Sequence, residues 1–208
     1  MPTTPSSTSS TSSASPAFLV LHGWQNHRPE AHWQHWLADR LTALGHSVTY
    51  PQLPDPDTPS LDAWLSELEG LLADFGPAAS ERVVIAHSLS AVLWLHAAAR
   101  DLPGVTGPDR VLLVAPPSAS VVRSHPEIAG FAPPPLSGLR LPTPTHLVAG
   151  DDDPYLPEGA QAAYGTPLGL TADLLPGAAH LDLDAGYGPW PSVLEWCLNP
   201  TTRLRVRP

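Results

Sequence analysis

Short apolar runs alternate with segments of helical periodicity along most of this chain. Six runs predict buried strands, at residues 17–23, 47–54, 82–86, 110–117, 145–150 and 169–177. Helical patterns lie at residues 30–44, 61–75, 89–99, 157–164 and 190–198. Strands that lack polar–apolar alternation and are separated by helices indicate a mainly parallel sheet with helices on both faces. The predicted fold class is therefore α/β.

Residue types at the segment ends mark where several elements stop. Ser60 precedes the pattern of residues 61–75 as an N-cap, and Gly45 follows the pattern of residues 30–44 as a stop signal. The segment at residues 118–143 is rich in proline and serine and has little periodicity. It predicts a loop or a small cover rather than a further layer of the fold.

The start of the chain differs in composition from the rest. Residues 1–16 are almost all Ser, Thr, Pro and Ala. They offer no apolar side chains to bury, so they predict a disordered tail. They also lack the basic start and the apolar run of a signal peptide. Residues 17–208 are long enough for one domain with a substantial core and short for two.

Charge and cysteine content exclude several function classes. The formal net charge is −10, which argues against nucleic acid or an anionic membrane surface as a partner. A single cysteine, Cys197, excludes an internal disulfide and a cysteine-based zinc cluster. No apolar run is long enough to span a membrane, so we expect a cytoplasmic protein. The oligomeric state is left open.

The fold class indicates where to search for a site. Parallel sheets bind ligands beyond the carboxyl ends of their strands. The loops at that edge are predicted at residues 22–29, 86–90, 116–125, 150–156 and 177–190. None of them carries a glycine-rich phosphate-binding motif, because His22-Gly23-Trp24 lacks the required spacing.

One of these loops places a serine between a predicted strand and a predicted helix. Residues 82–92 read RVVIAHSLSAV, with Ser88 at the junction. A tight strand-to-helix elbow exposes a nucleophilic serine and needs small residues two positions to either side. Ala86 and Ser90 meet that need, although the usual pattern has glycine there. A serine that only caps the helix is the alternative.

Two partners for Ser88 follow it in the chain, an acid and then a histidine, which is the order expected when the nucleophile lies on such an elbow in a parallel sheet. Three aspartates, Asp151 to Asp153, follow the strand predicted at residues 145–150, and His180 lies in a late loop. One aspartate must point inward to orient the imidazole, and the others then form a solvated acidic turn. The proline after Asp153 fixes the turn there and favours that residue.

The same loops supply candidates for the oxyanion hole and the pocket. An oxyanion hole needs two N–H donors aimed at one point, and the backbone N–H groups of Leu89 and Trp24 are the candidates. Gln25, Tyr155 and Trp190 are candidates for the wall of a substrate pocket.

Histidines near the start of the chain raise the question of a metal site. His32 and His35 are three residues apart in a predicted helix, with His27 nearby, but no carboxylate falls at the matching turn. We therefore expect no metal site.

Five stretches resemble a known family. They are HGWQNHRPEAHWQHWL (22–37), YPQLPDPDTPSLDAWL (50–65), AHSLSAVL (86–93), AGDDDPYLP (149–157) and GAAHLDLDAGYGPWP (177–191). Residues 17–198 resemble the α/β-hydrolase superfamily, and more narrowly the small serine hydrolases related to retinoblastoma-binding protein nine. The resemblance implies a minimal α/β-hydrolase fold without a large lid domain. It also implies that Ser88 is the nucleophile, Asp153 the acid and His180 the base.

Together these observations predict a serine hydrolase. We expect it to cleave small acyl esters in the manner of a carboxylesterase, with thioesters and amides left open, and to need no cofactor. The short cover and the acidic surface favour small neutral or apolar acyl substrates over anionic thioesters. The alternative from another class is a weakly catalytic or non-catalytic protein-binding module on a hydrolase fold.

Overall fold

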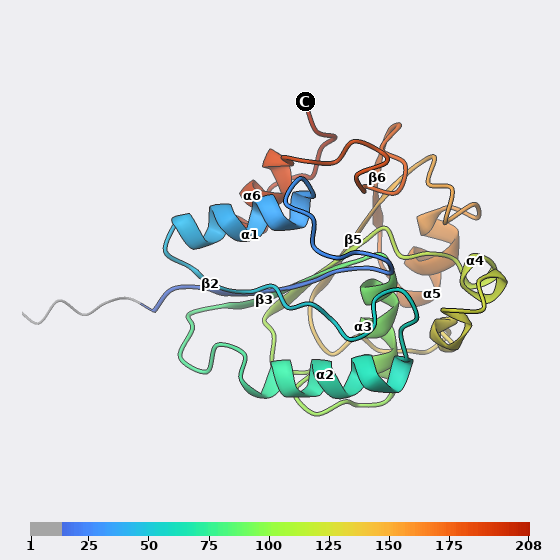
Figure 1. Cartoon of the computed structure of the whole chain (residues 1–208), viewed down its shortest axis with the longest axis horizontal. Helices are drawn as coiled ribbons and strands as arrows, with labels where there is room; N and C mark the ends of the chain where they lie inside the picture. The colour runs from blue at the N-terminus through green and yellow to red at the C-terminus, as the bar shows by residue number, and fades with distance from the viewer. Residues whose placement is uncertain (1–13) are drawn as a thin grey trace, which may run out of the picture.

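A single parallel sheet organises the molecule. The computed structural model describes residues 14–208, and its six strands are hydrogen-bonded in the order β2-β1-β3-β4-β5-β6 (Figure 1). The strands are β1 (Ala17–Leu21), β2 (Ser47–Thr49), β3 (Arg82–His87), β4 (Arg110–Val114), β5 (Thr145–Gly150) and β6 (Ala172–Leu175). Every neighbouring pair is parallel. The predicted α/β class is confirmed.

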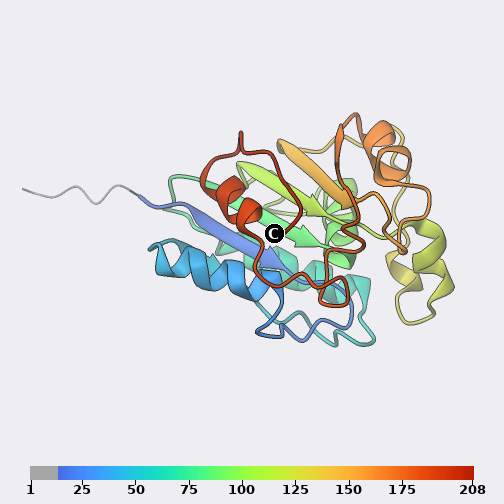
Figure 2. The same cartoon turned by 90° about the horizontal axis from the view of Figure 1, so that it is seen from above.

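Helices cover both faces of this sheet. Helices α1 (Trp33–Ala43) and α6 (Pro191–Leu198) lie on one face, and α2 (Leu61–Ala73) and α3 (Leu89–Ala99) lie on the other (Figure 1). The short helices α4 (Ala119–Ser124) and α5 (Thr166–Leu168) lie together at one end of the sheet, as the view from above also shows (Figure 2). Within residues 14–208 there is no large additional domain.

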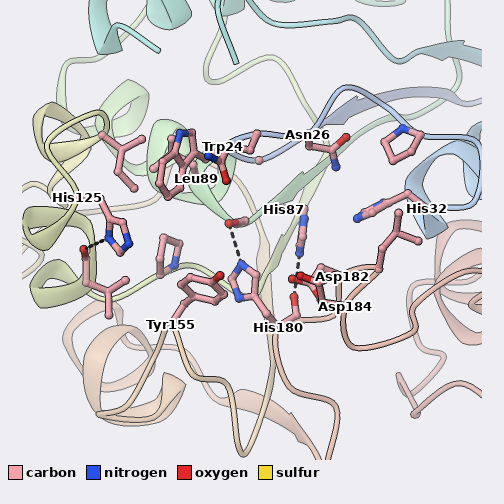
Figure 3. Close-up of a pocket in the computed structure, with 18 residues that line it drawn as sticks. Trp24, Asn26, His32, His87, Leu89, His125, Tyr155, His180, Asp182 and Asp184 are labelled. Carbon is pink, nitrogen blue, oxygen red and sulfur yellow. Dashed lines mark hydrogen bonds between the residues drawn. The ribbon is translucent and has the colours of Figure 1, made fainter. Parts of the chain in front are cut away.

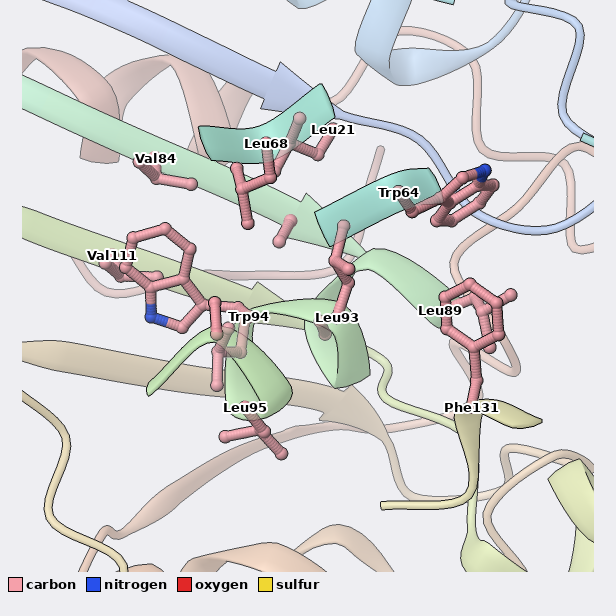
Figure 4. Packing of buried hydrophobic residues seen from close by; sticks show 14 of the residues in the cluster. Leu21, Trp64, Leu68, Val84, Leu89, Leu93, Trp94, Leu95, Val111 and Phe131 are labelled. Carbon is pink, nitrogen blue, oxygen red and sulfur yellow. The ribbon is translucent and has the colours of Figure 1, made fainter. Parts of the chain in front are cut away.

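The apolar strands bury side chains in two separate clusters, one on each face. In β1, Phe18 and Val20 pack on the α1 side, whereas Leu19 and Leu21 pack on the α2 side. Helix α3 is buried on all sides, because every side chain from Leu89 to Ala98 is buried, the polar Ser90 and His96 included. Leu93, Trp94 and Leu95 of this helix lie among the core side chains in Figure 4. Close packing on all sides holds such a helix in place. The residue directly before it, Ser88, is therefore held in a fixed position.

Several predicted boundaries are wrong, and proline and glycine explain the clearest cases. Strand β2 has three residues instead of eight, because the prolines that begin at Pro51 cannot continue a strand. The helix predicted at residues 157–164 begins only at Gln161, as a π-helix that leads into α5. Gly159, with φ of +76°, delays its start. Strands β1, β4 and β6 also end earlier than predicted, where the chain leaves the sheet for the loops of the site.

The proline-rich segment forms the small cover that its composition allows. It contains α4 and a single 3-10 turn at Ala129–Phe131. Ile128 and Phe131 are buried against the α2 side of the core. This segment therefore belongs to the domain and is anchored by its own apolar side chains.

The predicted tail lies mostly outside the described residues, which begin at Ala14. The backbone carbonyls of Ser15 and Pro16 accept hydrogen bonds from the N–H groups of Ser80 and Ser47, each at 3.3 Å. In the part of the chain that the structure describes, no helix is both long enough and apolar enough to cross a membrane.

Candidate active site

Ser88 lies on a strained turn between β3 and α3. Its φ of 55° and ψ of −122° are unfavourable for a residue with a side chain. Its backbone N–H donates to the carbonyl of Val114 on the neighbouring strand, at 2.8 Å. Its side chain makes no capping bond to α3. The reading of Ser88 as only a helix cap is therefore wrong, because Oγ lies 2.9 Å from Nε2 of His180 instead.

His180 joins Ser88 to a buried carboxylate. Its Nδ1 lies 2.9 Å and 3.0 Å from the two carboxylate oxygens of Asp153. The bond of its Nε2 to Ser88 is the dashed line at the His180 ring in Figure 3. The carboxylate only accepts, so Nδ1–H donates to it and Nε2 is free to accept the Ser88 hydroxyl proton. Asp153 is 4% exposed and His180 is 7% exposed. Three residues from separate loops thus form one hydrogen-bonded chain.

The other two aspartates are not merely a solvated turn, as the sequence had suggested. Asp151 accepts a hydrogen bond from the backbone N–H of Gly177, at 2.9 Å, and Asp152 accepts one from Ala179, at 2.8 Å. Both side chains are exposed, yet both hold the loop that carries His180. All three aspartates therefore bond to this histidine or to its loop, Asp153 to the ring and the other two to backbone N–H groups of the loop.

Two glycines allow the loops of the site to approach closely. A Cβ atom on Gly150 would lie 2.2 Å from the carbonyl oxygen of Ala179. A Cβ atom on Gly23 would lie 2.7 Å from Cβ of Ser88. Both distances are far below an ordinary contact, so neither position tolerates a side chain without movement of the site. Sequence reasoning missed both glycines, because nothing near them in the chain indicates a close approach.

The two oxyanion candidates both line the pocket around Ser88. In the described part of the chain, the backbone N–H groups of Leu89 and Trp24 donate to no other backbone group. The indole of Trp24 is fixed by its Nε1–H, which donates to the carbonyl of Asp57 at 2.9 Å. The hydroxyl of Ser90 donates to the carbonyl of His22 and so ties the elbow to the loop of Trp24. The oxyanion role of the two N–H groups stays a prediction.

A cavity of about 260 Å³ surrounds Ser88 and His180. Gln25 and Tyr155 line it, and the Tyr155 ring centroid lies 4.5 Å from that of His180. Their contact with a substrate stays a prediction. Trp190 does not line it. This indole is fully buried on the α1 side of the core, and its Nε1–H donates to the carbonyl of Arg205. An aromatic residue next to a motif serves the core as readily as a pocket, which is why the prediction failed.

A comparison with protein families adds a decisive observation. A family model described as serine hydrolase matches residues 18–198, which is most of the chain. The chain belongs to this family. A comparison with curated proteins finds no match.

Solved structures agree with this assignment at the level of the fold. A YdeN-like hydrolase from Pectobacterium atrosepticum has a TM-score of 0.68 and 22% identity, over 87% of this chain and 88% of that one. The ydeN gene product of B. subtilis has a TM-score of 0.66 and 17% identity, over 89% and 97%. An N-formylmaleamic acid deformylase from Pseudomonas putida has a TM-score of 0.58 and 17% identity, over 89% and 92%.

These likenesses confirm the minimal α/β-hydrolase fold. The narrower resemblance to retinoblastoma-binding protein nine stays a prediction.

Burial keeps three histidines of this serine hydrolase neutral. It lowers the pKa of His22 to about 4 and that of His32 to about 4, and it lowers the pKa of His87 well below its usual value. His22 Nε2 accepts from the backbone N–H of Leu53, at 2.8 Å, so this ring supports the loop beside the elbow. His32 caps α1 through Nδ1. Each ring therefore acts near neutral pH as a polar but uncharged group.

The histidines that had raised the metal question have other partners in the hydrolase. His27 bonds to Asp57 at 3.0 Å, and His35 Nδ1 bonds to the carbonyl of Arg28 at 3.2 Å. Among residues 14–208, no group of three or more His, Cys, Asp or Glu side chains is arranged to hold a metal ion.

Proposed function

We propose that this serine hydrolase cleaves small acyl esters, in the manner of a carboxylesterase, with Ser88 as nucleophile, His180 as base and Asp153 as the orienting acid. The observation that carries the proposal is the hydrogen-bonded chain from Asp153 through His180 to Ser88, with distances of 2.9–3.0 Å at each step. A serine hydroxyl becomes a useful nucleophile only when a neighbouring base takes its proton, and this chain provides that base.

The reaction proceeds in two halves through an acyl-enzyme. Ser88 Oγ attacks the carbonyl carbon while His180 Nε2 accepts the hydroxyl proton, and the same nitrogen then protonates the leaving alcohol. The Asp153 carboxylate holds His180 in the required tautomer and stabilises the imidazolium. The N–H groups of Leu89 and Trp24 stabilise the tetrahedral oxyanion. Water then attacks the acyl-enzyme, with His180 as base, and releases the acid and free Ser88.

The size and charge of the cavity favour small substrates without negative charge. At about 260 Å³ the cavity lies below the range of roughly 300–1,000 Å³ that is typical of sites for drug-sized ligands. Among residues 14–208, the charged side chains in its lining are aspartates, and no arginine lines it. Small neutral acyl esters therefore fit the site better than anionic thioesters do.

Covalent labelling by a fluorophosphonate probe tests the proposal directly. The parent protein should be labelled, whereas Ser88→Ala and His180→Ala should not be. Asp153→Asn should be labelled about 10⁴-fold more slowly, because its amide favours the wrong imidazole tautomer. Ser66→Ala is the matched control, because this serine is exposed on α2, and it should be labelled like the parent.

The opposite result would have a clear meaning. A parent protein that gives a cooperative thermal unfolding transition but is not labelled would contradict the proposal. The binding-module function would then be the better account of the same fold.

A further inference from the structure

The peptide group that joins Gly23 to Trp24 lies against the nucleophile. A Cβ atom on Gly23 would lie 2.7 Å from Cβ of Ser88 and 3.1 Å from its Oγ. This peptide group contains the carbonyl of Gly23 and the N–H of Trp24, which is one of the two proposed oxyanion donors. The peptide is trans, so its C=O and N–H groups point in opposite directions. A group that holds the carbonyl of Gly23 therefore also sets the direction of the Trp24 N–H.

The side chain that holds this carbonyl is His22. Its Nδ1 lies 2.8 Å from the carbonyl oxygen of Gly23. Its Nε2 lies 2.8 Å from the backbone nitrogen of Leu53 and 2.9 Å from the side-chain nitrogen of Gln52. A backbone N–H can only donate, so Nε2 accepts, and the proton of the neutral ring is on Nδ1. Nδ1–H therefore donates to the carbonyl of Gly23.

The surroundings of His22 keep this donor in place. The residue is fully buried, and its ring is in edge contact with that of Trp64, with the centroids 5.8 Å apart. Burial lowers the pKa of His22 to about 4, so the ring is neutral near pH 7. The backbone carbonyl of His22 accepts from the Ser90 hydroxyl, and that of Leu21 accepts from the Gln34 amide at 2.8 Å. Three consecutive carbonyls that lead to Trp24 are thus each bonded to a side chain.

A hydrogen bond to the carbonyl of a peptide also changes its N–H group. The bond draws electron density toward the oxygen, and the N–H becomes a stronger donor. Donors of an oxyanion hole stabilise the transition state most when they are oriented before the reaction begins. The bond from His22 to Gly23 can supply both the orientation and the stronger donor.

We propose that His22 is a positioning residue of the oxyanion hole, which holds the Gly23–Trp24 peptide so that the Trp24 N–H is aimed and polarised toward the developing oxyanion. The inference rests on the proposed function, because it assigns a support to one of the proposed oxyanion donors. The bond of Nε2 to Leu53 has a separate part, since it fixes the tautomer that makes Nδ1 a donor.

Two variants separate the two nitrogens of the His22 ring. His22→Asn keeps an amide donor at the position of Nδ1 and loses the acceptor for Leu53. His22→Gln keeps an acceptor at the position of Nε2 and loses the donor to Gly23. For 4-nitrophenyl butanoate, His22→Gln should lower kcat/KM by about ten- to a hundredfold, which is less than the loss of about 10²–10³-fold when a whole oxyanion donor is removed. His22→Asn should retain most of the parental kcat/KM.

A second substrate shows whether the effect passes through the oxyanion hole. In the thiono analogue of the same ester, sulfur replaces the carbonyl oxygen and is a weaker hydrogen-bond acceptor. The preference of the parent for the oxo ester should therefore fall about tenfold in His22→Gln and persist in His22→Asn. The matched control is His146→Gln, at a histidine that bonds to Asp173 and does not line the cavity, and it should leave the preference unchanged.

The tautomer of His22 can be measured on the parent protein without any variant. A long-range ¹H–¹⁵N spectrum, with the His22 ring assigned through its own backbone, should show the proton on Nδ1 and none on Nε2 near neutral pH. A proton on Nε2 would overturn the inference, because Nδ1 could then not donate to Gly23.

The kinetic outcomes separate this inference from the proposed function. A loss in His22→Asn as large as that in His22→Gln would mean that the ring acts through Leu53, and it would overturn the inference. So would equal losses for the oxo ester and the thionoester in His22→Gln. Each of these results leaves the esterase function standing if the fluorophosphonate labels Ser88. Failure of that label would overturn the proposed function itself, and this inference with it.

Discussion

The elbow that carries Ser88 and the loop that carries His180 are built in different ways. Strand β3 lies between β1 and β4, and its last residue, His87, is paired with Val114. Strand β6, which precedes the His180 loop, lies at the edge of the sheet and, within residues 14–208, pairs only with β5. The nucleophile is thus positioned by the backbone ladder of the sheet, and the base lies beyond the reach of that ladder.

The His180 loop is held by hydrogen bonds from side chains, where the elbow is held by pairing between strands. Asp151 and Asp152 accept from its backbone N–H groups. His87 and Trp33 donate to its carbonyls, with Trp33 Nε1 at 2.8 Å from the oxygen of Leu181. The residues on either side of His180, Ala179 and Leu181, have positive φ, which costs free energy unless the surroundings enforce it. The elbow should therefore resist substitution of its neighbours better than the loop does.

The largest effect is expected where the loop meets the sheet. In Gly150→Ala the new Cβ would lie 2.2 Å from the Ala179 carbonyl, and an ordinary contact begins at 3.4 Å, so the backbone of the loop must move by more than 1 Å. We expect kcat/KM for a neutral ester to fall by about a thousandfold or more, since a misplacement of about 1 Å alone costs about a hundredfold and the backbone strain adds to it. Steady-state kinetics together with thermal unfolding would check this. Near-parental kinetics would show that the loop adjusts freely.

A smaller loss is expected at the elbow. In Gly23→Ala the new Cβ would lie 2.7 Å from Cβ of Ser88, so a shift of about 0.7 Å restores an ordinary contact. We expect kcat/KM to fall by about a hundredfold or less, because the ladder of β3 limits the displacement. Gly70→Ala is the matched control, since nothing lies within 4 Å of its Cβ, and it should stabilise α2 by about 0.5–1 kcal/mol without a kinetic effect. A larger loss in Gly23→Ala than in Gly150→Ala would reverse the comparison.

The same contrast explains what the sequence could predict. All features of the elbow occur in one contiguous stretch, RVVIAHSLSAV, in which the strand, the small residues, the serine and the start of the helix follow one another. The order of the three residues, the proline after Asp153 and the resemblance to a family of hydrolases together selected Ser88, Asp153 and His180, which the structure brings together.

The supports of the loop could not be predicted in that way. The contacts of Asp151 and Asp152 join residues 26 and 27 positions apart, and the close approach of Gly150 to Ala179 depends on how the loop folds back. The sequence does not distinguish an exposed aspartate that only contacts water from one that accepts a hydrogen bond from a distant backbone N–H. Trp190 shows the same limit for aromatic residues, since burial in the core and contact with substrate favour the same side chain.

The smallest effect distinguishes a positioning contact from a structural one. Asp152→Ala removes the acceptor of the Ala179 N–H, next to His180, whereas Asp151→Ala removes that of Gly177, which precedes His180 by three residues. We expect Asp152→Ala to lower kcat by about tenfold with little change in KM. A hydrogen bond to a charged group contributes about 1.5–3 kcal/mol, and its loss allows the loop that holds the His180 ring to move. Asp152→Asn keeps an oxygen acceptor and should regain most of that loss, and Asp151→Ala should have the weaker effect. Equal kinetics for Asp152→Ala and Asp151→Ala would mean that these bonds stabilise the loop as a whole and do not set the position of His180.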